Sequence, residues 1–97
     1  MSLTNAIDLS GRRILLTGAA GGIGAATARA CAALGVKELI LADNGPLEKI
    51  GDELRSLDVA VMTHRCDLSQ RKDNAELIAM AGDLDAAVAC AGICPLE

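Results

Sequence analysis

A glycine cluster at residues 18–24 constrains the fold of this chain more than any other stretch. The run RRILLTG, residues 12–18, is apolar at its centre and ends at a glycine, which is typical of a strand buried on both faces. An alanine-rich segment of helical length, residues 22–34, follows at once, and Gly35 stands where helices commonly end. The cluster therefore occupies a tight turn from a strand to a helix.

Three physical demands favour glycine at such a turn. They are unusual backbone dihedral angles, close approach of the main chain to an anion, and tight packing of the helix against the sheet. The free amides and the dipole at the start of a helix also favour a pyrophosphate group. The glycines alone leave two interpretations open, a phosphate-binding turn and a structural turn without a ligand.

The rest of the chain repeats the alternation of strand and helix. Further strands are expected at residues 36–43, 58–66 and 84–92, and further helices at 45–57 and 70–82. Strands that alternate with helices pair in parallel through right-handed crossovers. The sequence therefore predicts an α/β fold with three layers, in which helices cover both faces of an open parallel sheet. The polar end of the third strand favours an edge position for it.

Two of the expected helices carry start signals. Pro46 stands where the first turn of a helix tolerates proline, and Ser69 can cap the helix over residues 70–82. The helix over residues 45–57 is expected to bury one apolar face, made of Leu47, Ile50, Leu54 and Leu57.

Composition indicates one globular domain over the 97 residues. A hydrophobic content of 52% and a net charge of −4 argue against disorder and against a nucleic-acid partner. No apolar run reaches the length of about 18 residues that a membrane span needs, and the N-terminus lacks the pattern of a signal peptide, so we expect a cytoplasmic protein. The chain has no Phe, Tyr or Trp, so its core must be aliphatic.

The four cysteines form no C-x-x-C pair, and we expect them to be small apolar side chains of the core. They are Cys31, Cys66, Cys90 and Cys94. A metal site that combines His64 with Cys66 and the later pair is the alternative, although its spacing matches no usual zinc pattern. We therefore assign no metal ligand.

Acidic and small residues follow the expected strands. Asp43 ends the second strand, 19 residues after Gly24, where a carboxylate can accept hydrogen bonds from the ribose of adenosine. Asp67 follows the third strand, and the run ACAG, residues 89–92, ends the fourth. All lie at the carboxyl edge of the sheet, where open α/β folds bind ligands. A carboxylate that caps a helix or holds a turn is the alternative for Asp43.

The run TGAAGGIG, residues 17–24, resembles the TGxxxGxG cofactor motif of the short-chain dehydrogenases/reductases. The resemblance implies a Rossmann-type sheet with strand order 3-2-1-4. It also implies cofactor contacts by the residues of the turn, Thr17, Gly18, Gly21, Gly22, Ile23 and Gly24. By the same resemblance, Asp43 matches the acidic residue of members that prefer NAD, with NADP less expected.

Two later stretches extend the resemblance. The run CDLS contains an aspartate followed by an aliphatic residue, Asp67 and Leu68, which implies contact with adenine. The run ACAG matches only the second half of the family's NNAG motif, because Ala89 and Cys90 replace its asparagines. Ala91 and Gly92 match and are expected close to the cofactor.

Residues 1–97 do not contain the catalytic residues that the resemblance implies. The resemblance implies a Ser and a Tyr-x-x-x-Lys pair beyond the fourth strand, and this chain has no tyrosine. We therefore assign no catalytic residue and expect residues 1–97 alone to be inactive. They are interpreted as one incomplete domain, the cofactor-binding half of a parent enzyme that transfers a hydride between NAD(H) and a small alcohol or carbonyl substrate.

The expected fourth strand also bears on assembly. An apolar fourth strand at the edge of the sheet favours pairing between chains, so we expect a homo-oligomer. The alternatives are a nucleotide-binding or sensing module without catalysis, complete at this length, and a methyltransferase that binds S-adenosylmethionine.

Overall fold

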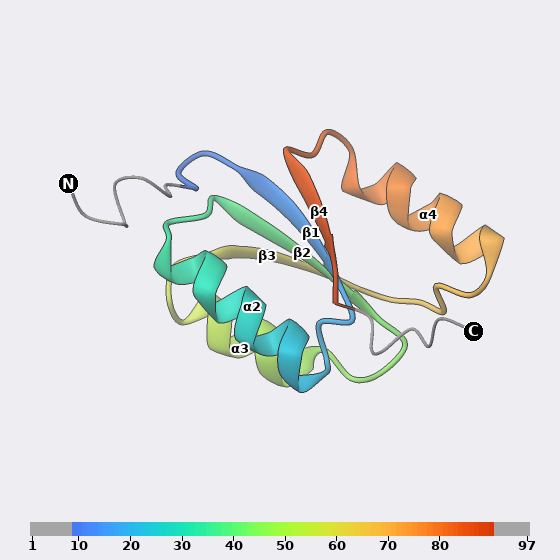
Figure 1. Ribbon diagram of the computed structural model, residues 1–97, viewed down its shortest axis with the longest axis horizontal. Helices are drawn as coiled ribbons and strands as arrows, with labels where there is room; N and C mark the ends of the chain where they lie inside the picture. The colour runs from blue at the N-terminus through green and yellow to red at the C-terminus, as the bar shows by residue number, and fades with distance from the viewer. Residues whose placement is uncertain (1–8, 91–97) are drawn as a thin grey trace.

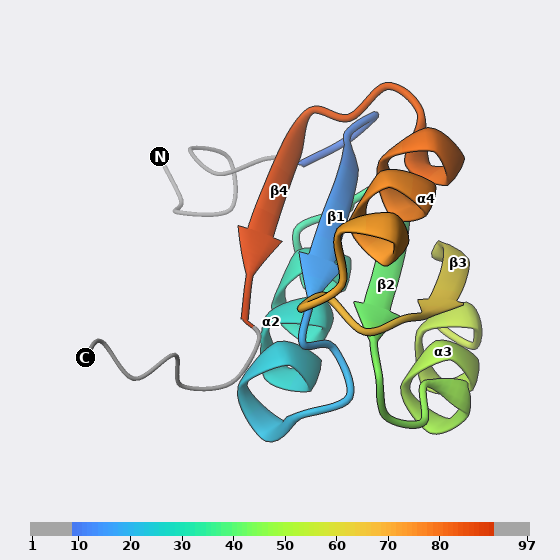
Figure 2. The same cartoon turned by 90° about the vertical axis from the view of Figure 1, so that its right-hand side faces the viewer.

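A parallel sheet flanked by helices organises residues 9–90, the part of the chain that the computed structural model describes (Figure 1). The strands are β1 (Arg13–Thr17), β2 (Glu38–Asp43), β3 (Ala60–Arg65) and β4 (Ala86–Ala89). The helices that connect them are α2 (Gly22–Ala33), α3 (Glu48–Arg55) and α4 (Arg71–Ala81). Helices α2 and α3 cover one face of the sheet and α4 lies on the other, which confirms the three expected layers (Figure 2).

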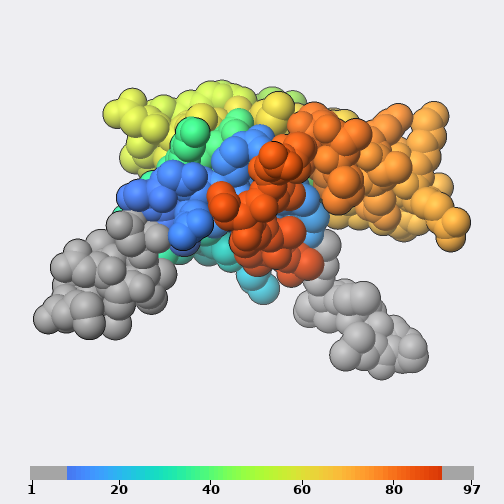
Figure 3. All heavy atoms as spheres, turned by 90° about the horizontal axis from the view of Figure 1, so that it is seen from above, coloured from blue at the N-terminus to red at the C-terminus, as the bar shows by residue number. Residues whose placement is uncertain are grey.

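The strand order is β3-β2-β1-β4, and every pair is parallel. This order confirms the expected one and places β3 at an edge, as its polar residues predicted. Strand β4 forms the other edge of the described sheet. Its four residues are all exposed, and the strand lies at the surface in the space-filling view (Figure 3).

The core consists of aliphatic and cysteine side chains on both faces of the sheet. Leu16, Leu39 and Leu41 face α2 and α3, whereas Leu15 and Ile40 face α4. Alternate residues of a strand point to opposite faces, so β1 and β2 supply both halves of the core. Burial of each of these side chains contributes about 1.5–3 kcal/mol to folding, which lets the fold dispense with aromatic residues.

The structure corrects the expected start of α3 and one of its apolar positions. The helix begins at Glu48, two residues after Pro46. Gly45 stays outside it because its amide is held by the Asp43 side chain and because the ring of Pro46 disfavours helical dihedral angles at the residue before it. Leu47, Ile50 and Leu54 are buried, as expected. Leu57 is 56% exposed because it lies beyond the last residue of the helix.

The expected cap of α4 was also wrong. Gln70 occupies the N-cap position of this helix and makes no capping bond with its side chain. The Ser69 hydroxyl instead donates to Asp67 Oδ1 at 2.7 Å, because the Asp67 carboxylate two residues earlier draws it into a local turn. Ser69 therefore belongs to the loop before α4.

Candidate functional site

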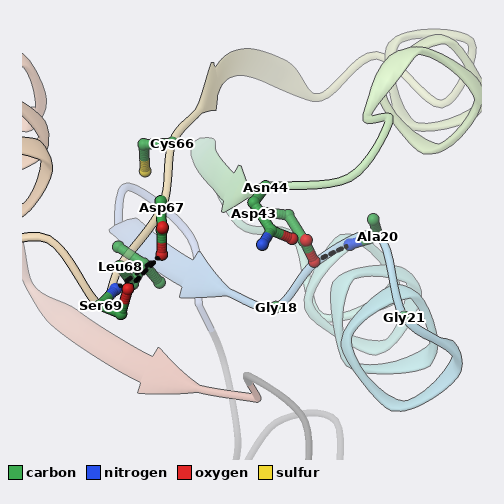
Figure 4. Close-up of a pocket in the computed structure, with 9 residues that line it drawn as sticks. All are labelled: Gly18, Ala20, Gly21, Asp43, Asn44, Cys66, Asp67, Leu68 and Ser69. Carbon is green, nitrogen blue, oxygen red and sulfur yellow. Dashed lines mark hydrogen bonds between the residues drawn. The ribbon is translucent and has the colours of Figure 1, made fainter.

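A cavity of about 500 Å³ opens at the carboxyl ends of β1, β2 and β3 (Figure 4). Its walls come from the turn after β1, the end of β2 and the loop that follows β3. The lining residues are Gly18, Ala20, Gly21, Asp43, Asn44, Cys66, Asp67, Leu68 and Ser69. This is the position at which open α/β sheets bind ligands.

Two glycines of the turn are required by the fold itself. Gly18 has a φ of +73°, in the left-handed region that side chains disfavour. A Cβ on Gly24 would lie 2.1 Å from the Gly18 carbonyl oxygen, so only glycine lets α2 start this close to the end of β1. These two residues explain the sharp turn and the close packing of the helix against the sheet.

The other two glycines have no such reason in the protein. A Cβ on Gly22 would meet nothing within 4 Å, and one on Gly21 would make only an ordinary contact of 3.6 Å with the Gly18 oxygen. Gly21 lines the cavity. The space beside Gly21 and Gly22 is therefore open to a group that approaches the main chain closely.

Helix α2 presents free main-chain donors at this turn. Its N-cap residue is Gly21, no side chain caps it, and its first turn contains no acidic residue. The first amides of a helix have no acceptor within the helix, and the helix dipole makes this end partly positive. The turn therefore has the electrostatics and the open space that an anionic group requires.

Asp43 joins the glycine turn to the loop after β2. Its Oδ2 accepts a hydrogen bond from the Ala20 amide at 2.9 Å, and its Oδ1 accepts one from the Gly45 amide at 2.8 Å. Asp43 therefore has the turn-holding role that was the alternative interpretation, and it also lines the cavity. Each carboxylate oxygen has a second lone pair, so these bonds leave acceptor capacity for a hydroxyl group.

Asp67 lies across the cavity, in the loop after β3. Its Oδ1 accepts two hydrogen bonds from Ser69, one from the hydroxyl at 2.7 Å and one from the amide at 3.0 Å (Figure 4). These bonds, first the hydroxyl and then the amide, hold the pKa of the Asp67 carboxyl below its usual range, with a further bond from Gln70. Asp67 is therefore an acceptor that stays ionised at neutral pH.

Cys66 places a thiol in the cavity wall next to Asp67. It is buried, and burial is the main cause that raises the pKa of the thiol above its usual value. The carboxylates of Asp73, Asp67 and Asp43 raise it further, in that order. The Cys66 side chain is thus a neutral, apolar part of the wall at physiological pH.

A second cavity, of about 310 Å³, lies between α2 and α3 and shares Ala20 and Gly21 with the first. Gly22 and Lys49 also line it. Its far end contains the Arg29–Glu53 ion pair, with Nε and Oε2 2.5 Å apart. The two cavities therefore meet at the glycine turn.

The structure thus brings together five of the predicted site residues around the first cavity: Gly18, Gly21, Asp43, Asp67 and Leu68. Gly22 lines the second cavity, whereas Thr17, Ile23 and Gly24 line neither. Ala91 and Gly92 lie outside the described residues.

Sequence reasoning missed four residues of the cavity wall, which are Ala20, Asn44, Cys66 and Ser69. Each stands within two residues of a predicted site residue. The only signal for them is therefore proximity along the chain to the glycine turn, Asp43 or Asp67.

No group of three or more His, Cys, Asp or Glu side chains within residues 9–90 could hold a metal ion. Cys31 and Cys66 are buried as expected, Cys90 is partly buried, and all three are free thiols; Cys94 lies outside that range. None of the described helices is long and apolar enough to cross a membrane.

Comparison with known proteins gives a consistent result. The family model for short chain dehydrogenases matches residues 12–97. A 3-oxoacyl-acyl-carrier-protein reductase of Rickettsia prowazekii is 36% identical over 88 residues, which cover 90% of this chain and 35% of the reductase. The chain therefore spans about a third of the length of the curated relative.

Solved structures agree with the sequence matches. A short-chain dehydrogenase/reductase from Mycobacterium marinum superposes with a TM-score of 0.76 at 31% identity, over 90% of this chain and 37% of that one. One from Burkholderia phymatum, in complex with NAD, gives a TM-score of 0.69 at 36% identity, over 76% of this chain and 27% of that one. These matches favour the dehydrogenase interpretation over a sensing module.

Proposed function

The chain belongs to the short-chain dehydrogenase family, and we propose from this membership that it binds the adenosine and pyrophosphate parts of NAD in an oxidoreductase. The proposed reaction moves a hydride between the nicotinamide and a small alcohol or carbonyl substrate. When bound, the dinucleotide supplies or accepts that hydride. The residues of this chain bind and orient it.

The observation that carries the proposal is the open space beside Gly21 and Gly22. Neither glycine is needed for a left-handed backbone or for packing within the protein. A pyrophosphate that lies against the main chain at the start of α2 supplies the missing reason for both. The uncapped amides of that helix are the donors we assign to it.

We assign the adenosine to the larger cavity. Asp43 is the proposed acceptor for the ribose hydroxyls, and the Asp67–Leu68 pair is proposed to contact adenine. A carboxylate gains a charge-assisted hydrogen bond from a free 2′-hydroxyl, whereas it repels the 2′-phosphate of NADP. We therefore propose NAD as the preferred cofactor, bound more tightly than NADP by about 10- to 100-fold.

Proton transfer to or from the substrate needs a group that these 97 residues lack. The chain contains no tyrosine, and no described side chain of the cavity has the role of a general acid next to a nicotinamide site. We infer that residues 1–97 alone do not catalyse hydride transfer.

Calorimetric titration of the protein expressed from its intact gene tests the proposal. We expect NAD to bind more tightly than NADP. We also expect Gly22→Val to abolish binding of both while the far-ultraviolet spectrum stays unchanged, since a side chain at residue 22 enters open space. Ala30→Val, at an exposed residue of α2 that lines neither cavity, is the matched control. A wild-type protein that binds neither dinucleotide contradicts the proposal.

A further inference from the structure

We propose that Asp73 and Asn74, in the first turn of α4, are positioning residues for adenine recognition, acting through the Asp67–Leu68 loop. The inference rests on the proposed function, because it assigns the adenine of the dinucleotide to this loop. It extends the site to two side chains that do not line the cavity.

Each of the two residues holds one main-chain group of the loop. Asp73 Oδ2 accepts a hydrogen bond from the Asp67 amide at 2.7 Å. Asn74 Nδ2 donates to the Leu68 carbonyl oxygen at 3.0 Å. Helix α4 therefore holds the main chain on both sides of the peptide bond between Asp67 and Leu68, at the Asp67 amide and at the Leu68 carbonyl.

The loop needs this support because it has no regular structure of its own. Upstream, the Cys66 amide donates to the Asp43 carbonyl at 2.8 Å, which ties the loop to the end of β2. Downstream, the Gln70 amide donates to the Asp67 carbonyl at 2.9 Å. The Asp67 amide between these ties is held by Asp73 alone among the described residues.

The bonds within the loop also set which oxygen of Asp67 faces other donors. Both donors of Ser69, the hydroxyl and the amide, bind Oδ1. Ser69 therefore leaves Oδ2 to other donors, which include the Gln70 side chain and, as proposed here, the amino group of adenine. Its hydrogen bond to a carboxylate requires the oxygen at a defined place, which depends on the main chain of Asp67.

A purely structural role for Asp73 is the competing explanation, because an acidic residue in the first turn stabilises a helix by its charge. Glu76 offers a matched control. It lies one turn further along α4, is exposed, and makes no hydrogen bond to the loop among the described contacts. Loss of a negative charge from α4 is common to Asp73→Ala and Glu76→Ala. Asp73→Asn removes the charge from the first turn itself but keeps an acceptor oxygen, so a positioning effect is lost in Asp73→Ala and retained in Asp73→Asn.

The test compares two ligands in the protein expressed from its intact gene. Nicotinamide purine dinucleotide has a hydrogen atom in place of the amino group of adenine and is otherwise identical to NAD. We expect the wild type to prefer NAD by about tenfold, the value of one charge-assisted hydrogen bond. Asp73→Ala should bring the ratio of the two Kd values close to one.

Three further variants separate the causes. Asp73→Asn keeps an acceptor oxygen for the Asp67 amide and should retain most of the preference, and Glu76→Ala should retain all of it. Asn74→Ala, at an exposed residue, removes the bond to the Leu68 carbonyl and should reduce the preference partially. It replaces Asp73→Ala as the test if that variant does not fold.

The outcomes are distinguishable from a failure of the proposed function. A wild type that binds neither dinucleotide overturns the proposed function and this inference with it. A wild type that binds NAD, with the same preference in Asp73→Ala or Asn74→Ala, overturns the positioning role alone. A wild type that binds both ligands equally also overturns it, because Asp67 then does not recognise the amino group.

Discussion

The Asp43 carboxylate accepts a hydrogen bond from the Ala20 amide at 2.9 Å, and this bond joins the end of β2 to the turn after β1. One side chain therefore shapes the glycine turn and also faces the proposed ribose site. A substitution at residue 43 is expected to change both the stability of the turn and the selection of the cofactor.

Asp43→Ala should lower the free energy of unfolding by about 1–3 kcal/mol, because it leaves the amides of Ala20 and Gly45 without their acceptor. It should also narrow the gap between NAD and NADP affinity, mainly by improving NADP. Asp43→Asn should lose less stability, since it keeps one acceptor oxygen. Urea denaturation and competitive titration measure the two effects. Asp52→Ala, at an exposed residue of α3, is the control. An unchanged cofactor preference in Asp43→Ala contradicts the assignment of the ribose.

Gly24→Ala should mainly reduce the stability of the fold, whereas Gly22→Ala should mainly reduce NAD binding. The first places a Cβ 2.1 Å from the Gly18 oxygen and should cost about 3 kcal/mol or more, because main-chain atoms must move. The second enters open space and should leave the melting temperature within about 2 °C of the wild type, while it weakens NAD binding. Calorimetric melting and titration of both variants check this. Equal destabilisation by both substitutions would show that the turn has a different shape.

The Cys66 thiol should react slowly at neutral pH. Its raised pKa leaves a smaller thiolate fraction at pH 7 than free cysteine has, and the rate should increase as the pH rises toward that pKa. Alkylation by iodoacetamide, followed residue by residue with mass spectrometry, measures the rate. Saturating NAD should slow it further, because Cys66 lines the cavity. Labelling of Cys66 as fast as glutathione at pH 7 would be inconsistent with its burial.

Ser69→Ala should raise the pKa of the Asp67 carboxyl, since the hydroxyl bond is the first cause of its lowered value. A carboxyl whose pKa is lowered by folding stabilises the fold above its unfolded-state pKa, and this contribution is lost as the pH falls through the folded-state pKa. In the variant, this contribution should therefore be smaller, and its loss should be complete at a higher pH. Carbon NMR titration of Asp67 measures the shift. Ser56→Ala, which removes a hydroxyl bonded to the Glu53 carbonyl, should leave it unchanged.

The polypeptide of residues 1–97, expressed alone, should self-associate through β4. The strand is exposed along its whole length and carries no charge, and such an edge is a template for another strand. Val88→Lys should reduce the association, whereas Ile78→Lys, at an exposed residue of α4, should not. Light scattering over a range of concentrations decides between these outcomes. A monomer that melts cooperatively at high concentration contradicts the prediction.

The layers of the fold were predictable because buried parallel strands and helices have distinct periods in the sequence. The strand order followed only from the resemblance of residues 17–24 to the family's cofactor motif. The residues at which helices begin were less predictable from the sequence. The start of α3 depends on a bond from the Gly45 amide to Asp43, and the start of α4 depends on a turn that Ser69 makes with Asp67. Both are side-chain contacts that compete with the capping signals of the sequence.

The candidate site was predictable where one residue type has a strict role, as at Gly18, Asp43 and Asp67. Cys66 was expected only to fill the core, because apolar residues that line a cavity have no signature apart from their neighbours. The bond from the Asp67 amide to Asp73 could not be foreseen, since its partners stand six residues apart, one in the loop after β3 and the other in α4.

The four glycines of the turn, Gly18, Gly21, Gly22 and Gly24, should differ in which substitutions they tolerate in a mutational scan. A screen that reports only folded protein should reject most substitutions at Gly18 and Gly24, where backbone dihedral angle and contact distance forbid a side chain. The same screen should accept many at Gly21 and Gly22. Only a screen for ligand binding should reject them at all four. The positions that pass the first screen and fail the second would outline the ligand without any bound structure.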